Sequence, residues 1–129
     1  MERFKINVVK IISVTAEDID DIMCTALESG ITYWCNKAEV VGDYLGKYAH
    51  EQIARNGVLK LYDAESDEIY TLTRDKLLNG IKLAIEANCL DVRAEYGWHI
   101  DNKIDTCCID AEIADVIVQM ALFDDVIFG

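Results

Sequence analysis

The 129-residue sequence has no proline and no long apolar run. Without proline, turns depend on glycine, asparagine and aspartate, which adopt positive φ or hydrogen-bond to nearby backbone. No apolar run approaches the ~18 residues that a membrane-spanning helix requires. Met1–Lys10 alternates charged and apolar residues and lacks the continuous apolar core of a secretory signal. The sequence therefore predicts a soluble, cytoplasmic protein.

The cysteines also argue against an exported protein. There are five of them, an odd number, and no secretory signal is expected. A disulfide framework in a small secreted domain normally uses an even number of cysteines. We therefore expect reduced thiols and no structural disulfide, as is usual in a cytoplasm.

Basic residues are scarce, because 12 lysines and arginines face 24 acidic residues, for a formal net charge of −12. Residues 1–64 carry a net charge of −3, whereas residues 65–129 carry −9. Such a charge repels a phosphate backbone and argues against nucleic-acid binding. It would attract a basic protein surface. The alternative is a solvated acidic surface that only keeps the protein in solution.

The strongest helical pattern lies within Ile104–Phe123, IDTCCIDAEIADVIVQMALF. Asp110 is placed to cap a helix, and Glu112 and Asp115 follow where the helix dipole favours negative charge. Apolar residues then recur with helical spacing at Ile113, Val116, Ile117, Met120 and Ala121. We predict that this helix forms the centre of the core.

Caps and alternating patterns predict the other elements. Thr15 and Thr73 are expected to cap helices that end near Gly30 and Asn88, and a further helix is expected around residues 48–54. Strands are predicted at Phe4–Val14, Ile31–Cys35, Val58–Asp63 and Glu68–Leu72, with a short edge strand within 124–129 and a loop at 89–103. One of the adjacent Tyr33 and Trp34 should be buried and the other exposed. The element order predicts one α+β domain spanning residues 1–129, with a small antiparallel or mixed sheet packed by three to four helices.

One candidate site would bind a metal. Cys107 and Cys108 precede a predicted helix amino terminus, where a thiol pKa falls and the thiolate that binds zinc is favoured. Further ligands would come from Cys35 and His99, with His50, Asp101, Asp105 and Asp110 as other donors. No CxxC or HxxxH spacing is present, and adjacent cysteines do not easily reach one tetrahedral ion. Zinc at Cys35, Cys107 and His99 is therefore one interpretation, and thiols without a ligand role are the other.

A second candidate site is a recognition surface. Tyr96 and Trp98 lie beside Asp101 in a stretch without periodicity, and exposed aromatics with a charged rim are typical of protein interfaces. The alternative is a loop whose aromatics pack on the core. The residues expected to contact a partner are Tyr96, Trp98, Asp101, Asp105, Asp124 and Asp125.

Several short motifs resemble a family of small acidic proteins encoded by phages, prophages and other mobile elements. These motifs are YWC at 33–35, GDYLG at 42–46, LYDAE at 61–65, IDTC at 104–107, and the ending from ALF at 121–123 to FG at 128–129. The resemblance covers about residues 15–129 and implies an accessory or counter-defence protein. Some proteins of this kind are similar to type II-A anti-CRISPR inhibitors, one of which is associated with a bound metal. The family pattern keeps thiols at Cys35 and Cys107 and varies at Cys108, His50 and His99, which weakens any site that needs both histidines.

Together these features predict a protein that is not an enzyme and has no catalytic residues. It would inhibit a host defence nuclease, such as a type II CRISPR effector, by binding a basic surface through its acidic carboxyl-terminal half. The alternative is a small metal- or thiol-dependent enzyme acting on a nucleotide or another small molecule, for example with Cys107 as nucleophile and His99 as base. A third interpretation, a nucleotide-binding sponge, would need basic residues around a pocket, and only Arg55, Arg74 and Arg93 are candidates.

Overall fold

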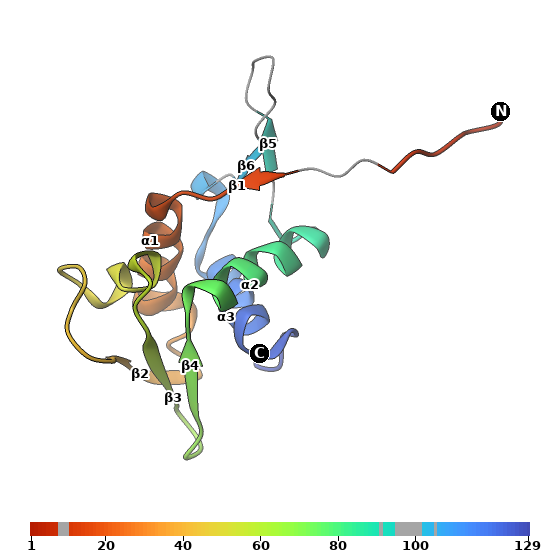
Figure 1. Cartoon of the computed structure of the whole chain (residues 1–129). Coiled ribbons are helices and arrows are strands. Elements are labelled where there is room, and N and C mark those ends of the chain that lie inside the picture. The colour runs from red at the N-terminus through yellow and green to blue at the C-terminus, as the bar shows by residue number, and fades with distance from the viewer. Residues whose placement is uncertain (8–10, 91, 95–101, 105) are drawn as a thin grey trace.

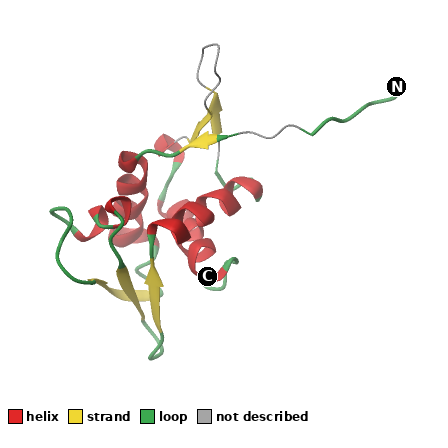
Figure 2. Ribbon diagram, viewed as in Figure 1, coloured by secondary structure: helices red, strands yellow, loops and turns green. Residues whose placement is uncertain are grey.

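A computed structural model describes residues 1–7, 11–90, 92–94, 102–104 and 106–129 (Figure 1). In this described part of the chain, three α-helices pack between two small sheets, which lie on opposite sides of the helices (Figure 2). One sheet is antiparallel and the other is mixed, so the predicted α+β class is confirmed. No helix in these residues is long and apolar enough to cross a membrane.

The antiparallel sheet has the order β2-β3-β4 and contains the predicted hairpin. Its strands are β2 (Cys35–Val40), β3 (Leu59–Asp63) and β4 (Ile69–Leu72). Leu59 and Leu61 are fully buried, whereas Lys60 between them is exposed, as the period-two pattern predicts. The tip of the β3–β4 hairpin projects beyond the helices (Figure 1).

The mixed sheet was only partly predicted. It consists of β1 (Ile12–Ser13), β6 (Asn102–Ile104) and β5 (Val92–Ala94), in the order β1-β6-β5. The prediction of a strand at Phe4–Val14 was wrong in extent, because the described part of residues 4–11 is outside any strand. The predicted loop at 89–103 holds β5 and most of β6, three-residue strands too short to leave an alternating pattern.

The first helix, α1 (Ala16–Thr25), begins at its predicted cap. The backbone N–H of Asp18 donates to Oγ1 of Thr15, and the N–H of Thr15 donates to the Asp18 carboxylate, both at 3.0 Å. A π-helical turn, η1 (Ala26–Gly30), then extends the helix to the predicted glycine. A Cβ at Gly30 would lie 2.7 Å from the backbone oxygen of Ala111, so close packing is the reason for this glycine.

The helices α2 (Arg74–Glu86) and α3 (Ala111–Phe123) form the centre of the core. The sequence predicted this central position for α3. The Thr73 and Asp110 side chains cap the two helices, and Asn88 follows α2 with a φ of 58°. The two helices approach closely at Gly80, where a Cβ would collide with the backbone oxygen of Ile117. A short 3-10 turn, η4 (Thr106–Cys108), leads into α3.

Three local predictions were wrong. The segment Ile31–Cys35 is a turn in which the N–H groups of Trp34 and Cys35 both donate to the oxygen of Ile31, and strand β2 begins only at Cys35. The helix expected around 48–54 is two 3-10 turns, η2 (Ala49–Glu51) and η3 (Ile53–Arg55). The residues after Asp124 form no strand, because their backbone is hydrogen-bonded to a side chain of α3.

Candidate functional site

A buried carboxylate on α3 organises one end of the molecule. Asp115 is 8% exposed, and no lysine or arginine in the described ranges forms an ion pair with it. Its oxygens instead accept hydrogen bonds from the Tyr33 hydroxyl at 2.6 Å, the Trp34 indole N–H at 2.7 Å and the Gln119 amide at 2.8 Å. Three neutral donors thus satisfy a buried charge, as a buried carboxylate requires.

Gln119 lies one helical turn after Asp115 and holds the carboxyl-terminal segment. Its Oε1 accepts from the backbone N–H groups of Ile127 and Phe128, both at 2.8 Å. The segment therefore folds back over α3, and the Phe128 ring stacks on the Trp34 indole with centroids 4.8 Å apart and planes 9° apart. Trp34 and Phe128, which are far apart in sequence, thereby form one aromatic cluster.

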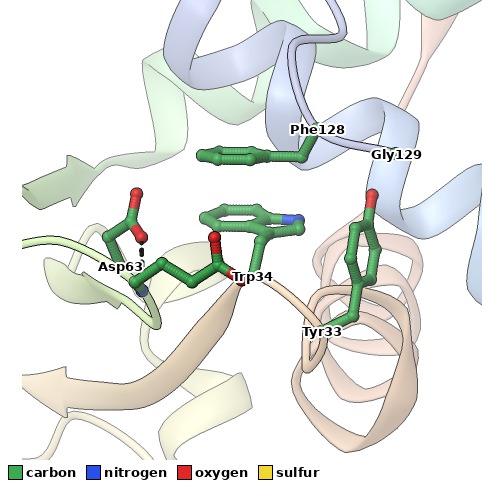
Figure 3. Close-up of a pocket in the computed structure, with 6 residues that line it drawn as sticks. Tyr33, Trp34, Asp63, Phe128 and Gly129 are labelled. Carbon is green, nitrogen blue, oxygen red and sulfur yellow. Dashed lines mark hydrogen bonds between the residues drawn. The ribbon is translucent and has the colours of Figure 1, made fainter.

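A pocket of about 220 Å³ opens beside this cluster (Figure 3). Its lining comes from the turn before β2, the end of the β3–β4 hairpin and the carboxyl-terminal segment. Figure 3 shows the Phe128 ring above the Trp34 indole, with the Asp63 carboxylate at the edge of the two rings and Tyr33 on the other side. The lining residues are Tyr33, Trp34, Asp63, Glu65, Phe128 and Gly129.

Two carboxylates supply the charge of this pocket. Asp63 accepts a hydrogen bond from the Glu65 backbone N–H at 2.9 Å and one from the Tyr70 hydroxyl at 2.8 Å. These two hydrogen bonds, with smaller contributions from the Ser66 hydroxyl and N–H, lower the pKa of Asp63, so this side chain is a carboxylate at neutral pH. Neither Asp63 nor Glu65 forms an ion pair with another residue of the described part.

The tyrosine hydroxyls around the pocket are poor candidates for acid–base chemistry. Burial of the hydroxyl and the hydrogen bond to Asp115 raise the pKa of Tyr33 to about 12, although 52% of the residue is exposed. Burial and the hydrogen bond to Asp63 raise the pKa of Tyr70 to about 12 as well. Both phenols hold their protons at neutral pH and act as donors. The pocket is thus suited to holding a cation, since aromatic rings and carboxylates both attract positive charge.

The predicted zinc ligands fall in different parts of the chain. Cys35 is 6% exposed and its thiol donates to the Lys37 backbone oxygen, while burial raises its pKa and disfavours the thiolate. Cys107 is exposed in η4, and His99 lies outside the described residues. Within the described ranges, no three His, Cys, Asp or Glu side chains are grouped as a metal site would require. Zinc binding through His99 stays a prediction.

The predicted partner-binding residues lie mostly in the part that the structure leaves undescribed. Tyr96, Trp98, Asp101 and Asp105 are outside the described residues. The other two, Asp124 and Asp125, are exposed at the end of α3. Asp124 accepts from the Asn79 side chain at 3.2 Å, and Asp125 accepts from the N–H of Val126. Both carboxylates face solvent and have only neutral partners.

Sequence reasoning missed the residues that build the pocket. It grouped Asp115 with Glu112 as a carboxylate near the amino end of a helix, and it gave Gln119 no role. A signal was present, because Asp115 and Gln119 are four residues apart and adjoin the apolar positions Ala114 and Val118, which are fully buried. Polar side chains at the margin of a buried helix face need partners elsewhere in the fold.

Comparison of the chain with family models, with curated proteins and with solved structures gives no match.

Proposed function

We propose that this protein acts by docking onto a basic surface of another protein, without making or breaking a bond in a substrate. The candidate partner is a host defence nuclease of the type II CRISPR class, which the protein would inhibit as a counter-defence factor of a phage or mobile element. The motifs YWC at 33–35 and IDTC at 104–107 motivate that choice of partner. The distribution of acidic side chains over the surface supports docking itself.

The main support is a surface of acids without counter-charges. Of the ten acidic side chains described between residues 65 and 129, Asp115 is buried and the other nine are exposed. Among those nine, only Glu86 forms an ion pair with another described residue. Uncompensated surface charge contributes little to folding and accelerates association with a surface of opposite charge.

The hairpin tip is the most concentrated part of this surface. Residues 63–68 read DAESDE, with four acids in six positions, and this turn projects from the body of the molecule (Figure 1). The remaining acids are spread: Asp110 and Asp124 flank the 13-residue α3, which at about 1.5 Å per residue separates them by roughly 20 Å. We therefore assign the docking surface to the hairpin tip, with Asp63, Glu65, Asp67 and Glu68, instead of to the whole carboxyl-terminal half.

A pull-down combined with a DNA-cleavage assay tests this proposal. The purified protein is mixed with a type II RNA-guided nuclease at low and at high salt. We expect binding and inhibition at low salt, both weakened at high salt, because ions screen interactions between exposed charges. Charge reversal at Glu65, Asp67 and Glu68 to lysine should weaken binding by about tenfold or more at low salt.

The matched control reverses three exposed acids of the amino-terminal half, Glu2, Glu17 and Asp21, and so changes the net charge by the same amount. If the position of the charge matters, this control binds nearly as well as the unaltered protein. Equal losses in both triple variants would assign the effect to net charge alone and contradict a docking surface at the hairpin. No binding at low salt would remove the nuclease as partner.

A further inference from the structure

We infer that the pocket between the aromatic cluster and the hairpin is a receptor for one arginine side chain of the partner. This inference rests on the proposed function, since it names the group that the acidic surface would capture. The pocket is bounded by three aromatic rings and two carboxylates, from Tyr33, Trp34, Phe128, Asp63 and Glu65. That combination matches a flat, positively charged group.

The size of the pocket limits what it can hold. Its volume is about 220 Å³, which is below the roughly 300–1,000 Å³ of clefts that enclose cofactors or drug-sized ligands. A single long side chain is the appropriate scale for such a space. A nucleotide would be larger, and its phosphates would be repelled by Asp63 and Glu65.

The charge of the pocket favours a guanidinium group. The Asp63 oxygens already accept from the Glu65 N–H and the Tyr70 hydroxyl, and Ser66 also hydrogen-bonds to this carboxylate, so Asp63 contributes to the pocket mainly through its negative charge. The Glu65 carboxylate is exposed and has no hydrogen-bond partner among the described residues. Arginine presents several N–H donors in one plane, so it can bond to carboxylates while its face lies against a ring. Lysine offers a strongly hydrated point charge without a face to stack.

The pocket is held in shape before any partner arrives. The hydrogen bonds of Asp115 fix Tyr33 and Trp34, and those of Gln119 fix the backbone at Phe128. Every buried polar side-chain atom in the described residues has a hydrogen-bond partner, so no unsatisfied buried side chain competes for these contacts. A pocket whose walls are already ordered loses less entropy when it binds a side chain.

Nuclear magnetic resonance of the isolated protein tests the inference with N-acetyl-arginine-N-methylamide as the probe. We expect saturable shifts of the Trp34 indole N–H and of the Glu65 and Gly129 amides, with a dissociation constant on the order of 1–10 mM for so small a ligand. The indole signal is assigned by its persistence in a Trp98→Phe variant. The N-acetyl-citrulline analogue is the matched control, because it has nearly the same shape without the charge.

The variant Glu65→Gln keeps the shape of an exposed side chain and removes one charge. It should weaken arginine binding by about fivefold or more, since a charge-assisted hydrogen bond becomes a neutral one. Glu112→Gln, an exposed acid on α3 outside the pocket lining, should leave arginine binding unchanged. The inference would be overturned if the citrulline analogue or N-acetyl-lysine-N-methylamide bound as tightly as the arginine probe. It would also be overturned if the arginine probe shifted resonances throughout the protein and these shifts were the same in Glu65→Gln.

The outcome separates this inference from the proposed function, because the probe needs no partner protein. If the pocket does not bind the arginine probe but the protein still binds the nuclease through its hairpin, the inference of an arginine receptor is wrong and the proposed docking stands. A pocket that binds arginine, in a protein that binds no basic protein, supports the receptor chemistry and removes the proposed docking partner.

Discussion

Trp34 donates its indole N–H to Oδ1 of Asp115 over 2.7 Å, a hydrogen bond that joins residues 81 positions apart. The indole is 3% exposed, so a lost partner would leave a buried donor unsatisfied. The same carboxylate accepts from Tyr33 and Gln119. Asp115 and Gln119 of α3 together thus connect the turn before β2 to the segment that closes the pocket.

Replacing Asp115 by alanine should therefore destabilise the fold. The variant leaves the Trp34 indole and the Tyr33 hydroxyl without their acceptor, and we expect a loss of about 3 kcal/mol in the free energy of unfolding. Urea denaturation followed by circular dichroism measures it. Glu112→Ala, on the exposed side of the same helix, should change the stability by less than about 0.5 kcal/mol. Equal effects in the two variants would show that Asp115 has no special role.

Replacing Gln119 by leucine should release the carboxyl-terminal segment. The side chain is fully buried, and leucine preserves apolar volume while removing the acceptor for the N–H groups of Ile127 and Phe128. We expect these two amides to lose their protection from hydrogen exchange, and the free energy of unfolding to fall by about 1–3 kcal/mol. Hydrogen exchange that stays slow at both amides in this variant would contradict the conclusion that Gln119 holds the carboxyl-terminal segment against α3.

The elements that sequence reasoning placed correctly are those with local signals. Thr15, Thr73 and Asp110 cap their helices because a cap depends on residues within three positions. The β3–β4 hairpin was found for a similar reason, since its strands alternate and a short polar turn joins them. The central position of α3 followed from its apolar spacing.

The pocket was not predictable in the same way. It depends on Asp115 meeting Trp34 and on Phe128 returning to the same indole, and no local pattern encodes contacts at those separations. The apolar run in 124–129 has the pattern of an edge strand, but the N–H groups of Ile127 and Phe128 donate to Gln119 and are therefore not available to pair in a sheet. Side-chain competition for backbone donors therefore overrode β propensity at this point.

Replacing Gly80 by alanine tests the close approach of α2 and α3. Without a neighbouring helix, this change inside a helix would stabilise the protein by about 1 kcal/mol, because alanine has the higher helix propensity. Here the added methyl group would collide with the Ile117 backbone oxygen and with the Cβ of Ala121. We expect a net destabilisation of about 1–3 kcal/mol, measured by urea denaturation. Lys82→Ala, exposed on the same helix, is the control, and a more stable Gly80→Ala variant would contradict the packing.

The two hydrogen-bonded phenols beside the pocket should make stability fall in strong base. Tyr33 and Tyr70 have pKa values raised from 10.0 to about 12, first by burial of the hydroxyl and then by a bond to a carboxylate. In the unfolded chain both ionise near pH 10, so between pH 10 and 12 the unfolded state binds fewer protons than the folded state. The slope of unfolding free energy against pH is then negative, and the contribution of these phenols is lost across that window.

Ultraviolet titration of tyrosinate, together with urea denaturation at each pH, measures this effect. In the folded protein the Tyr33 and Tyr70 phenols should ionise near pH 12, and their contribution to stability should be lost between about pH 10 and 12. Tyr33→Phe should remove one of these late ionisations and flatten part of the decline, and in the urea-unfolded protein both ionisations should occur near pH 10. If Tyr33 ionises near pH 10 while the protein is still folded, its hydroxyl does not donate to the buried Asp115 carboxylate in solution, and a different network of hydrogen bonds shapes the pocket.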